Sequence, residues 1–224
     1  ELYTRKAIEI KPDFADAHSN LGTILKDLGK SQDAFYSFLK VIDINPKHSN
    51  IYTFITIFLR DSDPSQLNKS KLKDILNLLL ERNEVSHKEL FNAFNFLYKN
   101  KIITILDKLE SDFSKIELLV NEKIIINALK KITFKDIRLE KLLTNTRKYV
   151  CNINNESKEE ISYSQLQFII ALGEQCFLNE YVYSLTKEEN ISINIILQKC
   201  KDGEVNEANI AILSCYVPLY KLLD

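Results

Sequence analysis

The stretch KAIEIKPD at residues 6–13 recurs as KVIDINPK at residues 40–47. Pro12 and Pro46 stand at the same place in the two copies, 34 residues apart, and the apolar positions before them match as well. A period of this length is typical of a helix-turn-helix repeat. Such helix pairs stack so that each covers an apolar face of the next. The spacing therefore predicts an all-α repeat fold for this part of the chain.

Residues 15–48 contain one complete repeat. Gly22 and Ala34 are small enough to let two antiparallel helices approach closely, and Gly29 can take the left-handed conformation that ends the first helix. Pro46 ends the second helix, because it lacks an amide donor and disfavours helix at the residue before it. Four apolar residues are expected to fill the seam between the helices: Leu21, Leu25, Phe38 and Val41.

These residues and their spacing resemble the tetratricopeptide repeat (TPR), although His18 stands where that family has a bulky aromatic residue. The resemblance implies a protein-binding module that does no chemistry of its own. Residues 1–12 resemble the second helix of a preceding repeat, and residues 49–60 resemble the first helix of a degenerate one. We therefore expect a TPR region at 1–64 and an α-helical domain at 65–224, both taken from a longer protein.

The composition of the chain limits which kinds of partner it can bind and indicates the compartment in which we expect it. The chain has 224 residues and a net charge of −1, so it offers no basic field for nucleic acid. Its longest apolar stretch, residues 51–59, is far shorter than the about 20 residues that span a membrane. The spacing of the cysteines matches no zinc or redox motif, and we interpret them as free thiols in a reducing cytoplasm. They are Cys151, Cys176, Cys200 and Cys215.

The placement of Gly and Pro indicates helices throughout the second part. Residues 65–172 contain neither, and apolar residues recur there at helical spacing. Capping-box sequences at Ser86, Ser114 and Thr186 predict three helix starts, and the polar run 151–160 predicts an exposed loop. Helices are expected at about 50–60, 67–82, 87–99, 101–110, 115–131, 135–150, 162–182, 187–201 and 205–216.

A second resemblance covers about residues 65–222. The segments ITFKDIRLEKLLTNTR at 132–147 and ALGEQCFLNEYVY at 171–183 resemble the helical region of bacterial TPR-methyltransferase proteins. In those proteins TPR repeats and a helical region precede an S-adenosylmethionine-dependent methyltransferase domain. No strand followed by a Gly-rich turn occurs in this sequence, so we expect the chain itself to bind no cofactor.

One peptide-binding groove is predicted on the first helix of the repeat. The stretch FADAHSNL at 14–21 also resembles the repeats of the eukaryotic O-linked N-acetylglucosamine transferase, which implies that Asn20 holds an extended peptide backbone. A side-chain amide suits that role, because it can donate and accept at once. An inert polar helix face is the alternative. The groove-facing positions in TPR stacks correspond here to Asp16, Ser19, Asn20, Thr23, Lys26 and Asp27.

Other polar residues leave two interpretations open. Gln175, Asn179 and Glu180 either face a cleft or a neighbouring domain, or serve as buried partners for helix ends. The three histidines, His18, His48 and His87, have no acidic residue or Cys at ligand spacing, so no metal site is predicted.

We therefore expect a non-catalytic interaction arm with a protein or peptide partner, preceding the enzyme domain of a bacterial, cytoplasmic protein. Two alternatives remain. The helical part contributes substrate contacts to a methyltransferase, or the parent protein carries a glycosyltransferase of the O-linked N-acetylglucosamine type. The truncated repeat at 1–12 also predicts fraying or self-association there, because its apolar residues lack a partner helix.

Overall fold

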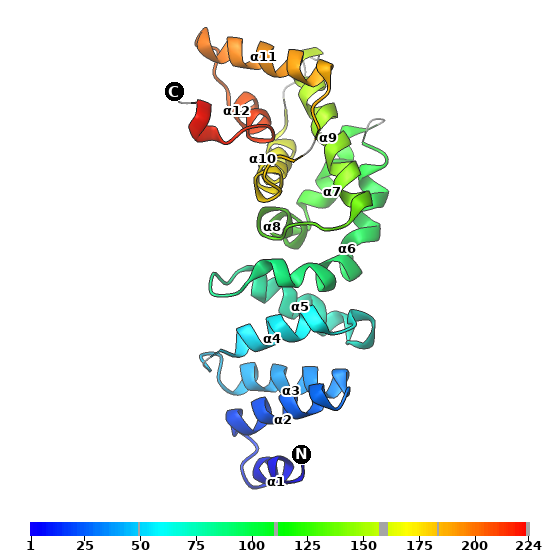
Figure 1. Ribbon diagram of the computed structural model, residues 1–224, viewed down its shortest axis with the longest axis vertical. Coiled ribbons are helices and arrows are strands. Elements are labelled where there is room, and N and C mark those ends of the chain that lie inside the picture. Colours follow the sequence, from blue (N-terminus) through cyan, green and yellow to red (C-terminus); the bar gives the residue numbers. More distant parts are fainter. Residues whose placement is uncertain (49, 110–111, 157–160, 183, 223–224) are drawn as a thin grey trace. The chain divides into compact units, whose positions relative to one another are not determined.

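The computed structural model describes residues 1–48, 50–109, 112–156, 161–182 and 184–222. These ranges contain twelve α-helices, four short 3-10 helices and no strand (Figure 1). The predicted all-α fold is therefore confirmed. The chain forms two compact units, Glu1–Leu97 and Tyr98–Asp224, and the division between them falls within one helix.

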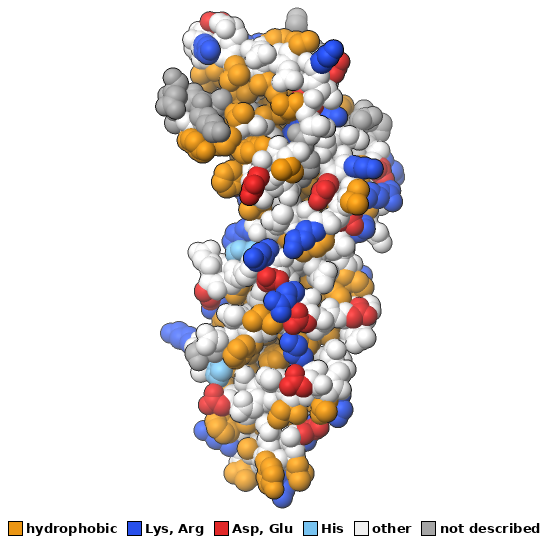
Figure 2. Space-filling model, viewed as in Figure 1, with side chains coloured by type: hydrophobic (Ala, Val, Ile, Leu, Met, Phe, Trp, Pro, Cys, Tyr) orange, Lys and Arg blue, Asp and Glu red, His pale blue; other side chains and the backbone are white. Residues whose placement is uncertain are grey.

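The first unit is a ladder of helices in which successive members lie side by side (Figure 1). Its helices are α1 (Leu2–Ile10), α2 (Ala15–Asp27), α3 (Ser31–Ile44), α4 (Ile51–Asp61), η1 (Pro64–Gln66), α5 (Lys69–Leu80), η2 (His87–Leu90) and the start of α6 (Phe91–Leu106). Basic and acidic side chains are interspersed over α1 to α5 on the face shown in Figure 2. The boundary at Leu97 divides the chain into two units that each pack internally. The predicted boundary at residue 64 marks the end of the repeat pattern instead, and it stays a prediction.

The repeat signature forms the contacts expected of it. A Cβ atom added at Gly22 would lie 2.6 Å from Cε1 of Phe38, so α2 and α3 approach too closely there for any larger residue. Gly29 has φ 72°, and Lys30 N donates to Leu25 O at 2.9 Å, which ends α2 in a left-handed turn. Ala34 and Val41 are fully buried in the seam. Helix α3 ends at Ile44, two residues before Pro46.

Aromatic packing joins the repeat to the next helix. The Phe58 ring of α4 stacks on Phe35 with centroids 6.0 Å apart and meets the edge of Phe38 at 5.5 Å. All three side chains are at most 2 % exposed. Such aromatic pairs contribute beyond their buried area. The stack therefore fixes how α4 sits on the repeat, as stacking in a repeat array requires.

The second unit is a helical array with its own core. Its remaining elements are η3 (Phe113–Ile116), α7 (Glu117–Val120), α8 (Lys123–Lys131), α9 (Ile137–Glu156), α10 (Tyr163–Leu178), α11 (Lys187–Lys201), α12 (Glu207–Ser214) and η4 (Leu219–Leu222). Helix α10 packs against both α8 and α12. Its core residues Phe168, Ile169 and Leu172 are fully buried.

Several predicted helix boundaries were wrong. The two helices expected at 87–99 and 101–110 form η2 and the single helix α6, because no breaker separates them. The helix expected at 115–131 is broken, since Glu122 takes a non-helical backbone (ψ 85°) at the start of α8 and pairs with Lys101 at 2.7 Å.

The polar run predicted to be a loop continues α9 as far as Glu156, because Val150 and Cys151 are buried at 3 % and 0 % exposure and hold that turn in the core. Residues 157–160 of that run lie outside the described residues. Helix α10 ends at Leu178 rather than at residue 182, because Glu180 and Tyr181 both have left-handed φ angles.

Of the three predicted capping boxes, the structure contains the one at Thr186 and not those at Ser86 and Ser114. Thr186 accepts from Glu189 N and the Glu189 side chain accepts from Thr186 N, as predicted. Ser86 makes no side-chain cap, and the 3-10 helix at residue 113 is capped by Asp112 rather than by Ser114. Among the described helices, none combines the length and apolar character needed to cross a membrane.

Candidate functional site

The residues predicted to line a groove lie on α2 with different surroundings. Asn20 is exposed, and within the described part of the chain its amide forms no hydrogen bond. Thr23 Oγ1 donates to the carbonyl of Ser19, which is 7 % exposed. Lys26 forms an ion pair with Asp61 of α4 at 3.2 Å, and Asp27 is exposed. The structure thus places the six residues on one helix but joins two of them to other elements.

Asp16 is the second of these joined residues. Its Oδ1 atom lies 2.9 Å from Nε2 of His48, in the turn that leads to α4. His18, at the position of the missing aromatic residue, places Nε2 2.9 Å from the carbonyl oxygen of Pro12. Both histidines therefore connect turns to α2. No group of three or more His, Cys, Asp or Glu side chains suited to a metal ion occurs in the ranges that the structure describes.

Helix α4, which lies one repeat length after α2, has no asparagine at the position equivalent to Asn20. Phe54 follows Asn20 by 34 residues, so it occupies the equivalent position on α4, and it is 44 % exposed. An amide ladder of the kind implied by the transferase resemblance would need a polar side chain there. The surface beside Asn20 is thus apolar on α4.

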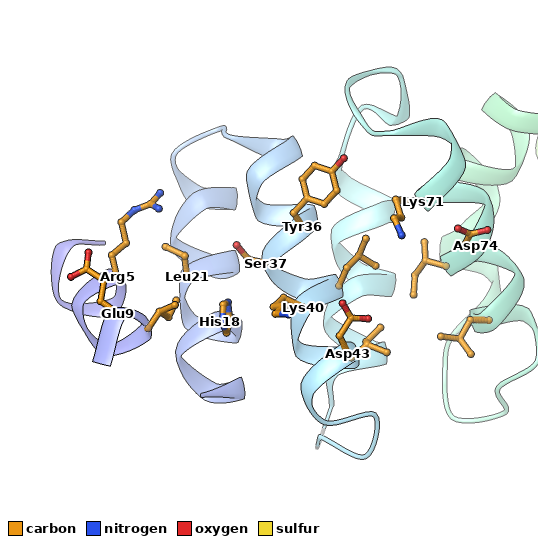
Figure 3. Close-up of a pocket in the computed structure, with 15 residues that line it drawn as sticks. Arg5, Glu9, His18, Leu21, Tyr36, Ser37, Lys40, Asp43, Lys71 and Asp74 are labelled. Carbon is orange, nitrogen blue, oxygen red and sulfur yellow. The ribbon is translucent and has the colours of Figure 1, made fainter. Parts of the chain in front are cut away.

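A groove of about 740 Å³ opens elsewhere in the first unit, among α1, α2, α3 and α5 (Figure 3). Tyr36 of α3 stands at its margin with 45 % of its surface exposed. None of the six predicted groove residues lines it. Its apolar lining consists of Ile8, Leu21, Leu39, Ile42, Ile75 and Leu78. The sequence prediction therefore missed the hollow, which is formed mainly by the second helices of the repeats.

Charged residues of both signs surround this apolar lining. Each of three helices contributes a basic residue followed about one turn later by an acidic one. The pairs are Arg5 and Glu9 on α1, Lys40 and Asp43 on α3, and Lys71 and Asp74 on α5, all exposed (Figure 3). Glu9 and Asp43 are 34 residues apart. The repeat spacing was the signal from which these positions could have been found.

Most of these charges have no partner within the described residues. Arg5 is the exception, because its Nη2 atom pairs with Glu1 at 2.9 Å. The side chains of Lys40, Asp43, Lys71 and Asp74 form no ion pair or hydrogen bond with another described residue. A hollow with an apolar base and unpaired charges of both signs at its margin can hold an amphipathic segment and orient it.

The structure places Gln175 in the core of the second unit at 1 % exposure. Its Nε2 atom donates to the carbonyl oxygens of Leu129 (3.1 Å) and Ile132 (2.8 Å), and its Oε1 atom accepts from Phe134 N at 3.2 Å. Every bond goes to the chain at the end of α8. The Gln175 amide is therefore fully engaged with backbone groups.

Asn179 and Glu180 lie in the turn after α10. Asn179 ends the helix, and its backbone N donates to Gln175 O at 3.1 Å. Glu180 is exposed and has φ 53°. The structure thus separates these two residues from Gln175, which faces the core, and a cleft or interdomain role for the three stays a prediction.

Comparison with known proteins finds one segment of the chain that matches a protein family. The family described as tetratricopeptide repeat matches residues 3–36, which cover α1, α2 and the first turns of α3. This match supports a TPR protein and starts one helix earlier than the predicted repeat at 15–48. No curated protein and no solved structure matches the chain.

Proposed function

We propose that the first unit is a protein-binding module whose groove among α1, α2, α3 and α5 holds an amphipathic helix of a partner protein. The TPR match at residues 3–36 supports an interaction role, since repeats of this class stack into binding surfaces. Helix-in-groove binding needs an apolar stripe on the ligand and an apolar hollow to receive it. The groove volume and its apolar lining support this mode.

One observation carries the proposal. Lys40, Asp43, Lys71 and Asp74 surround the apolar lining, and their charges are not paired with other described residues. Exposed charges at the margin of an interface steer association and fix the register of the ligand. A matching ligand has acidic and basic residues beside its apolar stripe. A ligand with one sign of charge would meet repulsion on at least two helices.

Synthetic helical peptides of about 14 residues test the proposal. Three peptides share one leucine stripe and differ in their flanking residues, which are mixed Glu and Lys, all Lys, or all Glu. The peptide with mixed flanks is expected to bind tightest. Tyr36→Glu should weaken its binding at least about tenfold, about 1.4 kcal/mol.

Phe96→Glu is the matched control, because Phe96 is in the same unit, is exposed to nearly the same extent as Tyr36 (44 % and 45 %) and does not line the groove. It is expected to leave the affinity unchanged. Equal losses in both variants, or equal binding of all three peptides, would contradict the proposal.

A separate proposal concerns Asn20. We propose that its exposed amide contacts the backbone of an extended peptide on α2, as the transferase resemblance implies. Its exposure and unengaged amide support this role. Because Phe54 occupies the equivalent position on α4, we expect a single such amide contact. The exposed Phe54 ring favours a ligand with an apolar side chain next to the backbone group that Asn20 binds.

At the level of the parent protein, we propose that the chain works beside a bacterial methyltransferase domain. The resemblance of segments 132–147 and 171–183 supports this, and it assigns Asn179 and Glu180 to substrate or interdomain contacts. A glycosyltransferase parent is the alternative. Four free thiols support a reducing cytoplasmic location. Sequencing the full-length gene tests the proposal, because a strand, a Gly-rich turn and an acidic residue about 20 positions later would follow the helical region.

A further inference from the structure

A second groove, with a volume of about 680 Å³, lies between α10 and α12 within the second unit. Figure 2 shows hydrophobic side chains gathered over these two helices. Three aromatic residues at the groove face solvent: Tyr163 is 77 % exposed, Phe177 55 % and Tyr220 65 %. Exposed apolar side chains gathered around a hollow mark interaction sites more often than inert surface.

The floor of this groove is set by a close approach of its two helices. A Cβ atom added at Gly173 of α10 would lie 2.1 Å from Oγ of Ser214 on α12. The Ser214 hydroxyl in turn donates to the carbonyl of Ala211 at 2.6 Å. Because Gly173, Ala211 and Ser214 all line the groove, its base is a packed helix crossing rather than a gap between loosely placed elements.

An unusual turn positions one wall. Glu180 and Tyr181 follow α10 with φ angles of 53° and 56°, a conformation that costs free energy in residues other than glycine. Tyr181 N donates to Cys176 O at 3.0 Å, which closes the turn. The turn brings the Tyr181 ring edge-on to Phe177, with centroids 6.3 Å apart. Both rings therefore stand along the groove.

The charges at the groove are acidic. Glu174 of α10 and Glu207 of α12 line it and are exposed, and the described side chains that line it include no Lys, Arg or His. Burial raises the pKa of Tyr181 to about 12, so its hydroxyl is neutral at physiological pH. The two carboxylates are thus the charged side chains among the described residues that line the groove.

We infer that this groove binds a basic, apolar peptide segment of another protein, with Lys or Arg side chains over the aromatic rings and beside Glu174 and Glu207. Aromatic faces attract cations, and the attraction strengthens where water is partly excluded. The carboxylates add charge complementarity from both helices of the groove, Glu174 on α10 and Glu207 on α12. The apolar base between them receives leucine-type side chains. This site is separate from the groove in the first unit and requires a basic ligand, whereas that groove requires a ligand with charges of both signs.

The test is a fluorescence titration of the full chain with two labelled helical peptides of about 14 residues. They share a leucine stripe, and one carries Lys beside the stripe where the other carries Glu. The Lys peptide is expected to bind at least about tenfold more tightly. Glu174→Gln combined with Glu207→Gln should remove most of that preference and flatten the salt dependence of binding.

The control variant combines Glu188→Gln with Glu204→Gln, because both residues are exposed in the same unit and neither lines the groove. It should retain the preference for Lys. Phe177→Ser should weaken the Lys peptide without a change in fold by circular dichroism. The inference is overturned if both peptides bind alike, if the two double variants behave alike, or if free tetramethylammonium ion binds as tightly as the Lys peptide.

Discussion

Arg147 of α9 and Glu189 of α11 form an ion pair at 2.9 Å with both side chains almost fully buried, at 2 % and 1 % exposure. The hydroxyl of Tyr216 donates to the same carboxylate oxygen at 3.0 Å, and the Arg147 guanidinium lies over the Tyr216 ring. The second Glu189 oxygen accepts from Thr186 N at 2.8 Å. One carboxylate thus connects α9, α11 and the chain after α12.

Glu189→Gln should destabilise the second unit by about 3–5 kcal/mol, because it leaves the buried guanidinium without a counter-charge. Urea unfolding followed by circular dichroism measures the loss. Glu188→Gln, at an exposed neighbouring position, serves as the control and should change stability by less than about 0.5 kcal/mol. Similar small effects of both changes would show that the buried pair contributes little.

Gly22→Ala should destabilise the first unit by about 1–3 kcal/mol, because its new methyl group would meet the Phe38 ring at 2.6 Å. In a Phe38→Leu background the same change should be neutral or stabilising, since the ring is gone and alanine favours helix. Thermal unfolding of the four proteins in this cycle measures the coupling. An equal cost of Gly22→Ala in both backgrounds would refute the close-contact explanation.

Asp136 gives the second unit an acid-sensitive contribution. Burial acts to raise the pKa of its carboxyl, but the Lys99 ammonium and the amides of Leu139 and Arg138 outweigh burial and hold the pKa below its ordinary value of 3.8. A lowered folded-state pKa stabilises the fold above the ordinary value, and that stability is lost as pH falls through the lowered pKa.

Asp136→Asn keeps an oxygen for the two amides and removes the charge. It should cost about 0.5–1 kcal/mol at pH 7 and progressively less as the pH falls below about 4. Urea unfolding of both proteins across this range measures the convergence. A stability difference that stays constant down to about pH 2 would rule out the charge as the cause.

Asn20→Ala should weaken binding of an extended peptide partner by about 1–3 kcal/mol, because the partner's backbone group would be left buried and unpaired. The melting temperature should change little, since the amide makes no hydrogen bond within the described residues. Calorimetry with a partner that co-purifies with the chain measures the affinity. Unchanged affinity would favour the inert-surface interpretation.

Helix α1 is expected either to fray or to associate with a second copy. It has no buried residue, and Leu2, Tyr3 and Ile10 are 66 %, 85 % and 86 % exposed. Each 100 Å² of such surface that becomes buried contributes about 2.5 kcal/mol. Hydrogen exchange should be faster in residues 2–10 than in residues 166–177 in a monomeric sample. Equal protection in a sample shown to be monomeric by light scattering would exclude both outcomes.

The repeat could be predicted residue by residue because the constraints that define it act between residues close in the sequence. Gly22, Gly29 and Pro46 each impose a backbone or contact constraint that does not depend on distant parts of the chain. The capping box at Thr186 is local in the same sense, and the structure contains it. The equally local box from Ser162 to Gln165 was readable too and was missed.

The rest depended on tertiary packing. The extension of α9 follows from burial of Cys151, which polar neighbours in the sequence conceal. The groove among α1, α2, α3 and α5 combines residues from helices whose relative placement is set by core contacts such as Phe35 with Phe58. The composition shows that acidic and basic residues are nearly equal in number, but it does not show which of these side chains lack an ion-pair partner in the fold.

The Gln175 amide also determines how the second unit can open. Its three bonds satisfy groups at and just after the end of α8, where a helix leaves its last carbonyls without partners of its own, and they span 41 to 46 residues of sequence. Withdrawal of α10 would break these three bonds, so the end of α8 would lose the support that Gln175 gives it. The two helices should therefore lose hydrogen-exchange protection together, as one cooperative unfolding unit.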